Sequence, residues 1–438
     1  MNNSIEKSGV QKWLAAERWF AGAFVAFFLA VFLGNKLIAA GHGLAGIGVI
    51  AALVQRDFRW KWDRFSRSTW CLLTFGVFAL LSIVANLDAV ESFGAHARKL
   101  RYELLVFVLL AIPAATRLLS QSIRLRDTCS AVWLGGLFLT TLLGLASFFF
   151  GDRLSFLTEI GYQGRVSGIY GQVMTFAHAL LFSSVALAAL VMKPILLRQL
   201  TRIPHWVFVA ATILAGISLY FTYTRGAVLA AAVALFVLAF QHSRRVVIGL
   251  VVVAVCFVAY AYNDYYGGGQ TPRYFNVQDP VRINQWTTSA LAFAENPVFG
   301  VGFVNFEPQS VKLKERYGLK PVKKVGKRKD RKWVYFKGHS HNNYLEAFAA
   351  TGVFGGLAFL GFCGFWLFEV SRSKYAPLLV PPLVALLVSG CFENTFFDSE
   401  VLNGILLLYV VSQVVLARER SNSLEPGITP PLSPSSLA

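Results

Sequence analysis

Four short polar stretches of this 438-residue chain hold the residue types that could do chemistry, and each lies beside an apolar segment. Three of them contain an arginine, namely Arg165, Arg225 and Arg282, and the fourth contains His339 and His341. A guanidinium group keeps its charge and binds phosphate oxygens through a planar fork, but it is costly at a membrane face unless it has a partner. Three arginines without matching acidic residues therefore indicate an anionic ligand. The alternative for each arginine alone is that it extends to lipid headgroups.

His341 is the candidate proton acceptor, because histidine is the side chain that exchanges protons near neutral pH. It stands at the start of a predicted helix and near several arginines. Positive charge and a helix N-terminus both disfavour the imidazolium ion, so we expect a neutral, basic ring. For His339 the simpler interpretation is an interfacial histidine that hydrogen-bonds a carbonyl group.

The composition predicts that membrane helices position these residues. Hydrophobic residues make up 55% of the chain and charged residues 15%, with a mean hydropathy of +0.55. Soluble domains carry about 25% charged residues, so the deficit favours an all-α integral membrane protein. The formal net charge is nevertheless +18. Five cysteines lie in or beside apolar segments without CxxC or Cys/His spacing, which argues against a disulfide framework or a zinc site.

The apolar segments predict about twelve transmembrane helices, since about 20 apolar residues cross the hydrocarbon core as a helix. They are 19–36, 38–55, 69–86, 100–116, 128–150, 172–192, 205–223, 226–241, 246–262, 343–370, 376–393 and 400–417.

Lysine and arginine gather in alternate loops, and the side that such loops share is the cytoplasmic one. Twelve spans place both termini on that side. The chain then divides into nine spans (1–262), a large periplasmic loop (263–342), three more spans (343–417) and a Ser/Pro-rich cytoplasmic tail that we expect to be disordered (418–438).

The four polar stretches together resemble the O-antigen ligase and polymerase superfamily of bacterial envelope glycosyltransferases. His341-Asn342, nine further residues and then Gly352-Val353-Phe354-Gly355 resemble the His-Asn and Gly-x-x-Gly signature of the ligases. Arg225 to Leu229 is similar to their Arg-x-x-x-Leu motif.

The large loop adds two stretches that are similar to the signature of that loop across the superfamily. They are Arg282-Ile283-Asn284-Gln285-Trp286 and Asn296-Pro297-x-x-Gly300-x-Gly302. The similarity runs from about residue 160 through 356, together with the layout of twelve helices and one large loop.

The resemblance implies a GT-C-like enzyme of the bacterial inner membrane whose active site faces the periplasm. Such an enzyme transfers O-antigen from undecaprenyl pyrophosphate to lipid A–core, with membrane lipids around it and without a cofactor, a metal ion or nucleic acid. In agreement, the large loop has no Asp-x-Asp pair for a divalent cation.

By the same resemblance, His341 takes the proton of the acceptor hydroxyl, and direct displacement inverts the anomeric carbon. Arg225 and Arg282 hold the donor pyrophosphate, and Arg165 joins them. The residues with a supporting role are His339, Asn342, Gly352 and Gly355.

A lysine-rich stretch between Lys312 and Lys332 is not part of the family pattern. One interpretation is a docking surface for the phosphorylated core of the acceptor, with Lys323, Lys324, Lys327 and Arg328 at its centre. The other is a solvated loop attracted to anionic headgroups.

Three other functions remain open from the sequence. An O-antigen polymerase would use the same lipid-linked donor but a second lipid-linked glycan as acceptor. A protein O-oligosaccharyltransferase is a related alternative, usually with a longer chain. A polysaccharide transporter would need charged residues in the middle of its helices, and the predicted spans have almost none.

Overall fold

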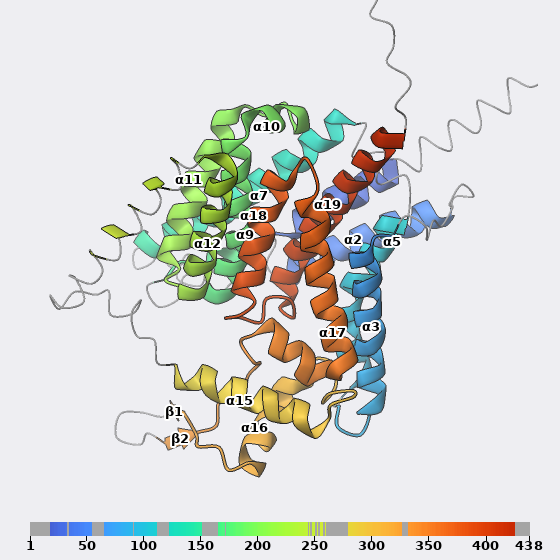
Figure 1. The fold of residues 1–438 in the computed structure, drawn as a ribbon, viewed down its shortest axis with the longest axis vertical. Coiled ribbons are helices and arrows are strands. Elements are labelled where there is room, and N and C mark those ends of the chain that lie inside the picture. The colour runs from blue at the N-terminus through green and yellow to red at the C-terminus, as the bar shows by residue number, and fades with distance from the viewer. Residues whose placement is uncertain are drawn as a thin grey trace, which may run out of the picture.

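A computed structural model gives the fold, a bundle of helices with a smaller layer of loop elements at one end (Figure 1). The structure describes residues 18–32, 35–54, 65–90, 92–111, 122–150, 165–170, 172–243, 279–325 and 332–424, with isolated positions between 245 and 259. The long α-helices are α2 (Asn35–Val54), α3 (Arg67–Ala85), α7 (Ile123–Phe150), α9 (Val173–Met192), α11 (His205–Phe221), α12 (Arg225–His242), α15 (Pro280–Glu295), α17 (Asn343–Ser371), α18 (Ala376–Ser389) and α19 (Ser399–Leu424). The shorter ones are α4 (Phe93–Ala97), η2 (Arg98–Leu100), α5 (Arg101–Ala111), η3 (Gly168–Tyr170), α10 (Pro194–Leu200) and α16 (Phe306–Arg316).

Six of the described helices, or seven if the bent pair α10 and α11 forms one span, are long and apolar enough to cross a membrane. The six are α3, α7, α9, α12, α17 and α19 as far as Arg420. Helices suit this environment because hydrocarbon offers no partner for a free backbone group. The protein is therefore a multi-pass, all-α membrane protein.

The count of twelve spans stays a prediction. Helices over Arg18–Ala30, Ile38–Val54 and Ala376–Ser389 are apolar but shorter than a full span. Most of the expected span 246–262 lies outside the described residues, with isolated positions described. The segment 205–223 appears as α11, which meets α10 at an angle of 109°.

Aromatic rings fill the contact between α3, α17 and the chain that leads into α19. Phe75 of α3 meets Phe359 of α17 with ring centroids 5.4 Å apart, and it also meets Phe396 at 6.0 Å. Phe359 and Phe396 are themselves 4.9 Å apart. This packing fixes the loop between α18 and α19 against the bundle.

The large loop contributes α15, α16 and a two-stranded antiparallel sheet of β1 (Lys323–Val325) and β2 (Lys332–Val334). Lys314 of α16 is fully buried and joins these elements. Its Nζ atom donates to Gln285 Oε1 at 2.7 Å and to the carbonyl of Phe336 at 2.6 Å. Burial lowers the pKa of Lys314 to about 8. One lysine of the basic stretch is thus part of the fold.

The Asn-Pro-x-x-Gly-x-Gly turn packs against a break in α17. At Gly352 the backbone takes φ 72° and ψ −168°, which interrupts the helix. The carbonyl of Pro297 accepts from Val353 N at 2.8 Å, and the carbonyl of Ala349 accepts from Val301 N at 2.9 Å. A Cβ on Gly352 would collide with the backbone of Val298. Glycine is required there because both the backbone angle and the close approach exclude a side chain.

The last helix extends further than the sequence predicts. The final span was expected to end at 417, with a disordered tail from 418, but α19 continues to Leu424. Arg418, Glu419 and Arg420 are good helix formers, so the helix does not have to end where its apolar segment ends. In Figure 1 this end of α19 and the loop elements α15 and α16 lie at opposite ends of the molecule.

Candidate functional site

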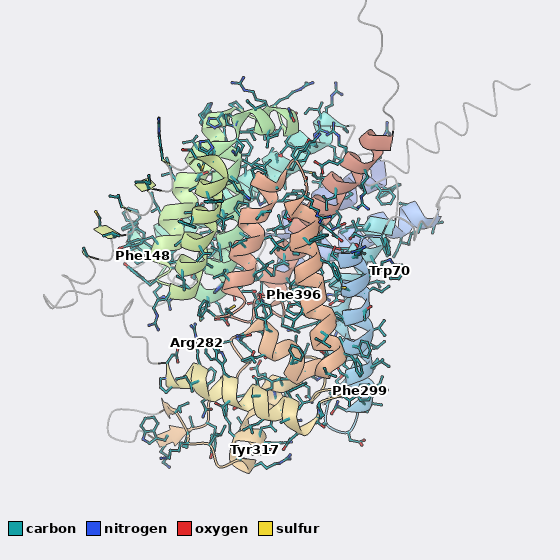
Figure 2. All side chains as sticks on the ribbon, viewed as in Figure 1. Trp70, Phe148, Arg282, Phe299, Tyr317 and Phe396 are labelled. Atoms are coloured by element: carbon teal, nitrogen blue, oxygen red, sulfur yellow. The ribbon has the colours of Figure 1, made fainter. Side chains whose placement is uncertain are left out.

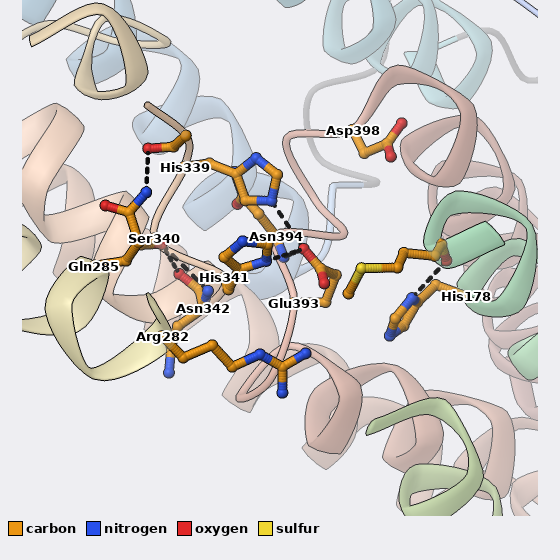
Figure 3. Close-up of polar contacts among 12 residues, drawn as sticks. His178, Arg282, Gln285, His339, Ser340, His341, Asn342, Glu393, Asn394 and Asp398 are labelled. Carbon is orange, nitrogen blue, oxygen red and sulfur yellow. Dashed lines mark hydrogen bonds and ion pairs between the residues drawn. The ribbon is translucent and has the colours of Figure 1, made fainter. Parts of the chain in front are cut away.

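Glu393 joins the two histidines of the polar stretch. Its Oε1 atom lies 2.8 Å from His339 Nε2 and 2.8 Å from His341 Nδ1 (Figure 3). The side chains of Glu393 and His341 are largely buried, with 9% and 13% exposed, whereas that of His339 is 37% exposed. The glutamate comes from the loop between α18 and α19, and the histidines come from the segment before α17.

Glu393 and His339 stabilise each other's charged forms. Burial alone would raise the pKa of Glu393, but the hydrogen bonds from His339 and His341 hold that pKa well below its usual value. Burial alone would lower the pKa of His339, but the hydrogen bond and charge of Glu393 raise it above its usual value. The interpretation of His339 as a histidine that bonds a carbonyl is therefore wrong, because its partner is a carboxylate.

His341 is held in an uncommon backbone conformation, with φ at 52°. Ser340, just before it, donates its N–H to Glu346 Oε2 at 2.8 Å, and its hydroxyl donates to the carbonyl of Asn342 at 2.7 Å. A left-handed non-glycine residue costs about 1–3 kcal/mol and persists only where its surroundings impose it. Such residues cluster at active sites, so the conformation itself marks His341 as a functional candidate.

Asn342 and Asn343 tie the histidine segment to the loop that carries Glu393. The side chain of Asn342 caps α17 by accepting from Tyr344 N at 2.9 Å, and its Nδ2 donates to the carbonyl of Cys391 at 3.0 Å. Asn343 accepts from Phe396 N at 2.9 Å. These contacts flank Glu393 on both sides and hold its carboxylate beside the rings.

Arg165 and Arg225 come together at the turn before α12. Arg165 Nε donates to the carbonyl of Thr222 at 2.7 Å, and its Nη2 donates to Thr224 Oγ1 at 3.2 Å. Arg225 is the first residue of α12. A Cβ on the next residue, Gly226, would lie 3.0 Å from Phe392 Cβ, so this helix start is packed against the loop of Glu393.

Arg282 lies near the start of α15, between that helix and the bundle (Figure 2). Its Nε atom is 3.5 Å from Asp279 Oδ2, so this arginine has an acidic neighbour that the sequence interpretation did not assign. Arg282 and Glu393 both interact electrostatically with His178 of α9. Figure 3 shows Arg282 reaching into the region of His341 and His178.

The remaining predicted residues divide into structural and undescribed ones. Gly352 and Gly355 shape α17: the first breaks it, and a Cβ on the second would lie 3.4 Å from Phe78 Cβ as well as collide with Thr351. Lys323 and Lys324 form strand β1. Two residues of the expected docking surface, Lys327 and Arg328, lie outside the described residues.

The His339, His341 and Glu393 atoms lie within 4.8 Å of one another and could hold a metal ion. Two histidine nitrogens and one carboxylate form a ligand set that zinc accepts. Both nitrogens instead contact the same carboxylate oxygen at hydrogen-bond distance. The groups therefore pair with each other directly and do not need an ion between them.

Glu393 is the main functional candidate that the sequence interpretation missed. Its only sequence signal is a carboxylate in an otherwise apolar region, Cys391-Phe392-Glu393-Asn394-Thr395. The other missed group, Asp279, had a clearer signal, because it precedes Arg282 at helical spacing.

The structure combines a bundle of apolar helices with a histidine–carboxylate group that has arginines near it. This combination is consistent with a membrane enzyme of O-antigen processing, the class that the family comparison supports. The O-antigen ligase family matches residues 210–360, about a third of the chain. The match supports membership of the O-antigen ligase and polymerase superfamily, as the sequence motifs predict. No curated protein matches the chain.

The matched region includes Arg225, Arg282 and His341 as well as Gly352 and Gly355 of α17. Arg165 and Glu393 lie outside it. The family supports a ligase-like or polymerase-like function on lipid-linked polysaccharide in general.

Proposed function

We propose that this protein is an O-antigen ligase, a GT-C-like glycosyltransferase of the bacterial inner membrane. It transfers O-antigen polysaccharide from undecaprenyl pyrophosphate to lipid A–core on the periplasmic side. The observation that carries the proposal is the contact of His341 Nδ1 with Glu393 Oε1 at 2.8 Å, beside the start of α12 that bears Arg225.

The carboxylate assigns the two ring nitrogens of His341 to different roles. Nδ1 donates its hydrogen to Glu393, so Nε2 carries the free lone pair that can accept a proton. The negative charge of Glu393 then stabilises the imidazolium that forms, as the acid does in histidine–carboxylate pairs of hydrolases. A general base in position contributes roughly 10²–10⁴ in rate.

The transfer itself is a single displacement. The acceptor hydroxyl gives its proton to His341 Nε2 while its oxygen bonds to the anomeric carbon of the donor sugar. The bond from that carbon to the pyrophosphate oxygen breaks, and undecaprenyl pyrophosphate leaves with the electron pair. Attack from the opposite face inverts the anomeric carbon.

Arginines stabilise the leaving group. Arg225 and Arg282 bind the pyrophosphate and offset the negative charge that grows on it, and Arg165 supports Arg225 through the Thr222–Thr224 turn. The bond to the pyrophosphate is already activated, so the reaction needs neither ATP nor a metal ion.

The product of the purified protein tests the proposal. It is incubated with lipid-linked O-antigen and lipid A–core in EDTA, and the glycan is followed by gel and mass spectrometry. Glycan attached to lipid A–core supports a ligase. If the glycan instead lengthens on its polyprenyl carrier and none reaches the core, a polymerase replaces the ligase; no change in either glycan rejects both.

A further inference from the structure

A polar cavity of about 540 Å³ lies on the His339 side of the histidine–carboxylate group. This volume is in the range of about 300–1,000 Å³ that small-molecule sites occupy. His339 lines the cavity, whereas His341 does not. The wall comes from segments far apart in the chain: α16, the start of α17, the residues before α9 and the loop into α19.

Hydrogen-bond acceptors dominate the cavity wall. Four carboxylates line it, those of Glu307, Glu346, Asp398 and Glu400. Among the described lining residues, Lys99 is the one amine and no arginine is present; its Nζ already donates to the carbonyl of Phe397 at 2.9 Å. An ionised carboxylate accepts hydrogen bonds and a protonated carboxyl can also donate one, so the wall suits a ligand whose hydroxyl groups both donate and accept.

Asn394 adds an independent sign of a ligand. This side chain lines the cavity, is 7% exposed, and its Oδ1 atom has no hydrogen-bond partner. Buried polar atoms are nearly always paired, so a buried amide with unused hydrogen-bonding capacity is expected where a ligand completes the set. Either orientation of the amide leaves this capacity at the cavity.

The composition of the wall disfavours a pyrophosphate and favours a neutral polyol. Among the described lining residues the cationic groups are Lys99 and His339, no arginine fork is present, and hydrogen-bonding oxygens outnumber these two, so the wall is poorly suited to hold a pyrophosphate. A single cation is also disfavoured, because among the described residues the one cluster of three ligand atoms is His339, His341 and Glu393, and the four cavity carboxylates form none. Dispersed acceptors around a cavity suit a ligand with several dispersed hydroxyl groups, which is a sugar.

We infer that this cavity binds the uncharged terminal sugar of the acceptor and presents its hydroxyl, past His339, to His341, whose ring centroid lies 4.3 Å from that of His339. The inference rests on the proposed function and deepens it by separating two subsites. The arginines on the Arg225 side take the donor pyrophosphate, and the acidic cavity takes the nucleophile. Phosphate groups of the acceptor then stay outside the cavity.

The test is saccharide binding to the full-length protein in detergent, with core oligosaccharide freed of lipid A and of phosphate as the probe. Saturation-transfer NMR or calorimetry gives the dissociation constant. Glu307 is exposed and lies on α16, so Glu307→Ala does not disturb a packed core. Glu315→Ala is its matched control, because Glu315 is exposed on the same helix and does not line the cavity.

We expect the probe to bind wild type and the Glu315→Ala control alike, and Glu307→Ala to bind about tenfold more weakly, since bonds to charged groups are the stronger ones. Asn394→Leu is a second variant that removes the amide with the unpaired oxygen from the cavity wall, and we expect a similar loss. No binding to wild type, or binding by both cavity variants with the affinity of wild type, overturns the inference.

Transfer kinetics keep this inference distinct from the proposed function. If transfer to lipid A–core occurs, Glu307→Ala should raise the acceptor KM and leave the donor KM within about twofold; an unchanged acceptor KM rejects the cavity alone. If no transfer occurs but the cavity variants lose saccharide binding, the ligase proposal fails and the sugar subsite stands.

Discussion

The Nδ1 atom of His341 and the Oε1 atom of Glu393 lie 2.8 Å apart, although the residues are 52 positions apart in the chain. The same oxygen also meets His339 Nε2, so one carboxylate orients two imidazole rings. Each ring thereby has one nitrogen committed to Glu393. This arrangement gives a histidine at a membrane site the fixed orientation that a general base needs.

Replacing the carboxylate by its amide tests this arrangement. Glu393→Gln keeps the shape of the side chain but removes the charge that stabilises the imidazolium. We expect the turnover number to fall by roughly 10²-fold, at the lower end of what a positioned base contributes, with the donor KM nearly unchanged. Steady-state transfer kinetics measure both, with the exposed Glu315→Gln as the control. A turnover number equal to that of wild type would remove Glu393 from the mechanism.

The charge of His339 predicts a pH-dependent stability. The pKa of His339 is raised in the folded protein, so its contribution is fully present below the unfolded pKa of about 6.5 and is lost as pH rises through the raised value. The thermal midpoint of His339→Gln should therefore lie furthest below that of wild type at pH 6 and closest to it at pH 9. Scans over this range in detergent measure the difference.

Glu393 supplies the internal check for the pH prediction. In a Glu393→Gln background the hydrogen bond and charge that raise the pKa of His339 are gone, while burial still lowers that pKa, so adding His339→Gln should no longer lower the midpoint most at pH 6. A difference that is constant from pH 6 to 9 in the wild-type background as well would contradict the ion pair.

Much of the fold was predictable because lipid imposes a simple rule on apolar segments. The spans expected near 69–86, 128–150 and 343–370 correspond to α3, α7 and α17. The break in α17 was not predictable from hydropathy, because Gly352 depends on the close approach of the turn at Val298. The length of α19 was missed for a related reason: helical propensity continues where hydrophobicity stops.

The site was predictable only in part. His341 carries a recognisable motif, but Glu393 is a single acidic residue whose role depends on contacts from Asn342 and Asn343 across the fold. The spacing of residues along the sequence does not reveal a contact that is made across the fold. The lysine-rich stretch shows the opposite error, because charge alone suggested one surface although Lys314 is buried and structural.

Gly352 should be intolerant of even the smallest side chain. Gly352→Ala places a Cβ against the Val298 backbone at φ 72°, so we expect a loss of about 1–3 kcal/mol in unfolding free energy and a lower thermal midpoint. Gly364→Ala is the matched control in α17, because a Cβ there meets nothing within 4 Å. Equal midpoints for the two variants would show that the break is not essential.

We expect the residues of the basic stretch to have two roles, with Lys314 stabilising the fold and the others forming a docking surface. Replacing Lys323, Lys324, Lys327 and Arg328 together by glutamine should raise the acceptor KM by roughly three- to tenfold and flatten its salt dependence, with the thermal midpoint unchanged. Lys314→Met should lower the thermal midpoint and leave the acceptor KM unchanged, because it leaves Gln285 and the carbonyl of Phe336 without their donor. If the variant with four substitutions keeps its acceptor KM but binds anionic vesicles more weakly, the surface binds lipid headgroups and not the acceptor.

The central claim is that His341 is the base for a metal-independent transfer, and one assay of wild type and His341→Ala tests it most directly. Both proteins receive saturating lipid-linked O-antigen and lipid A–core in EDTA without ATP, and the initial rate of glycan attachment to the core is measured. We predict that wild type is active and that His341→Ala is slower by roughly 10²–10⁴-fold. An undiminished rate in His341→Ala, or a wild-type rate that disappears in EDTA and returns with zinc, would contradict the account.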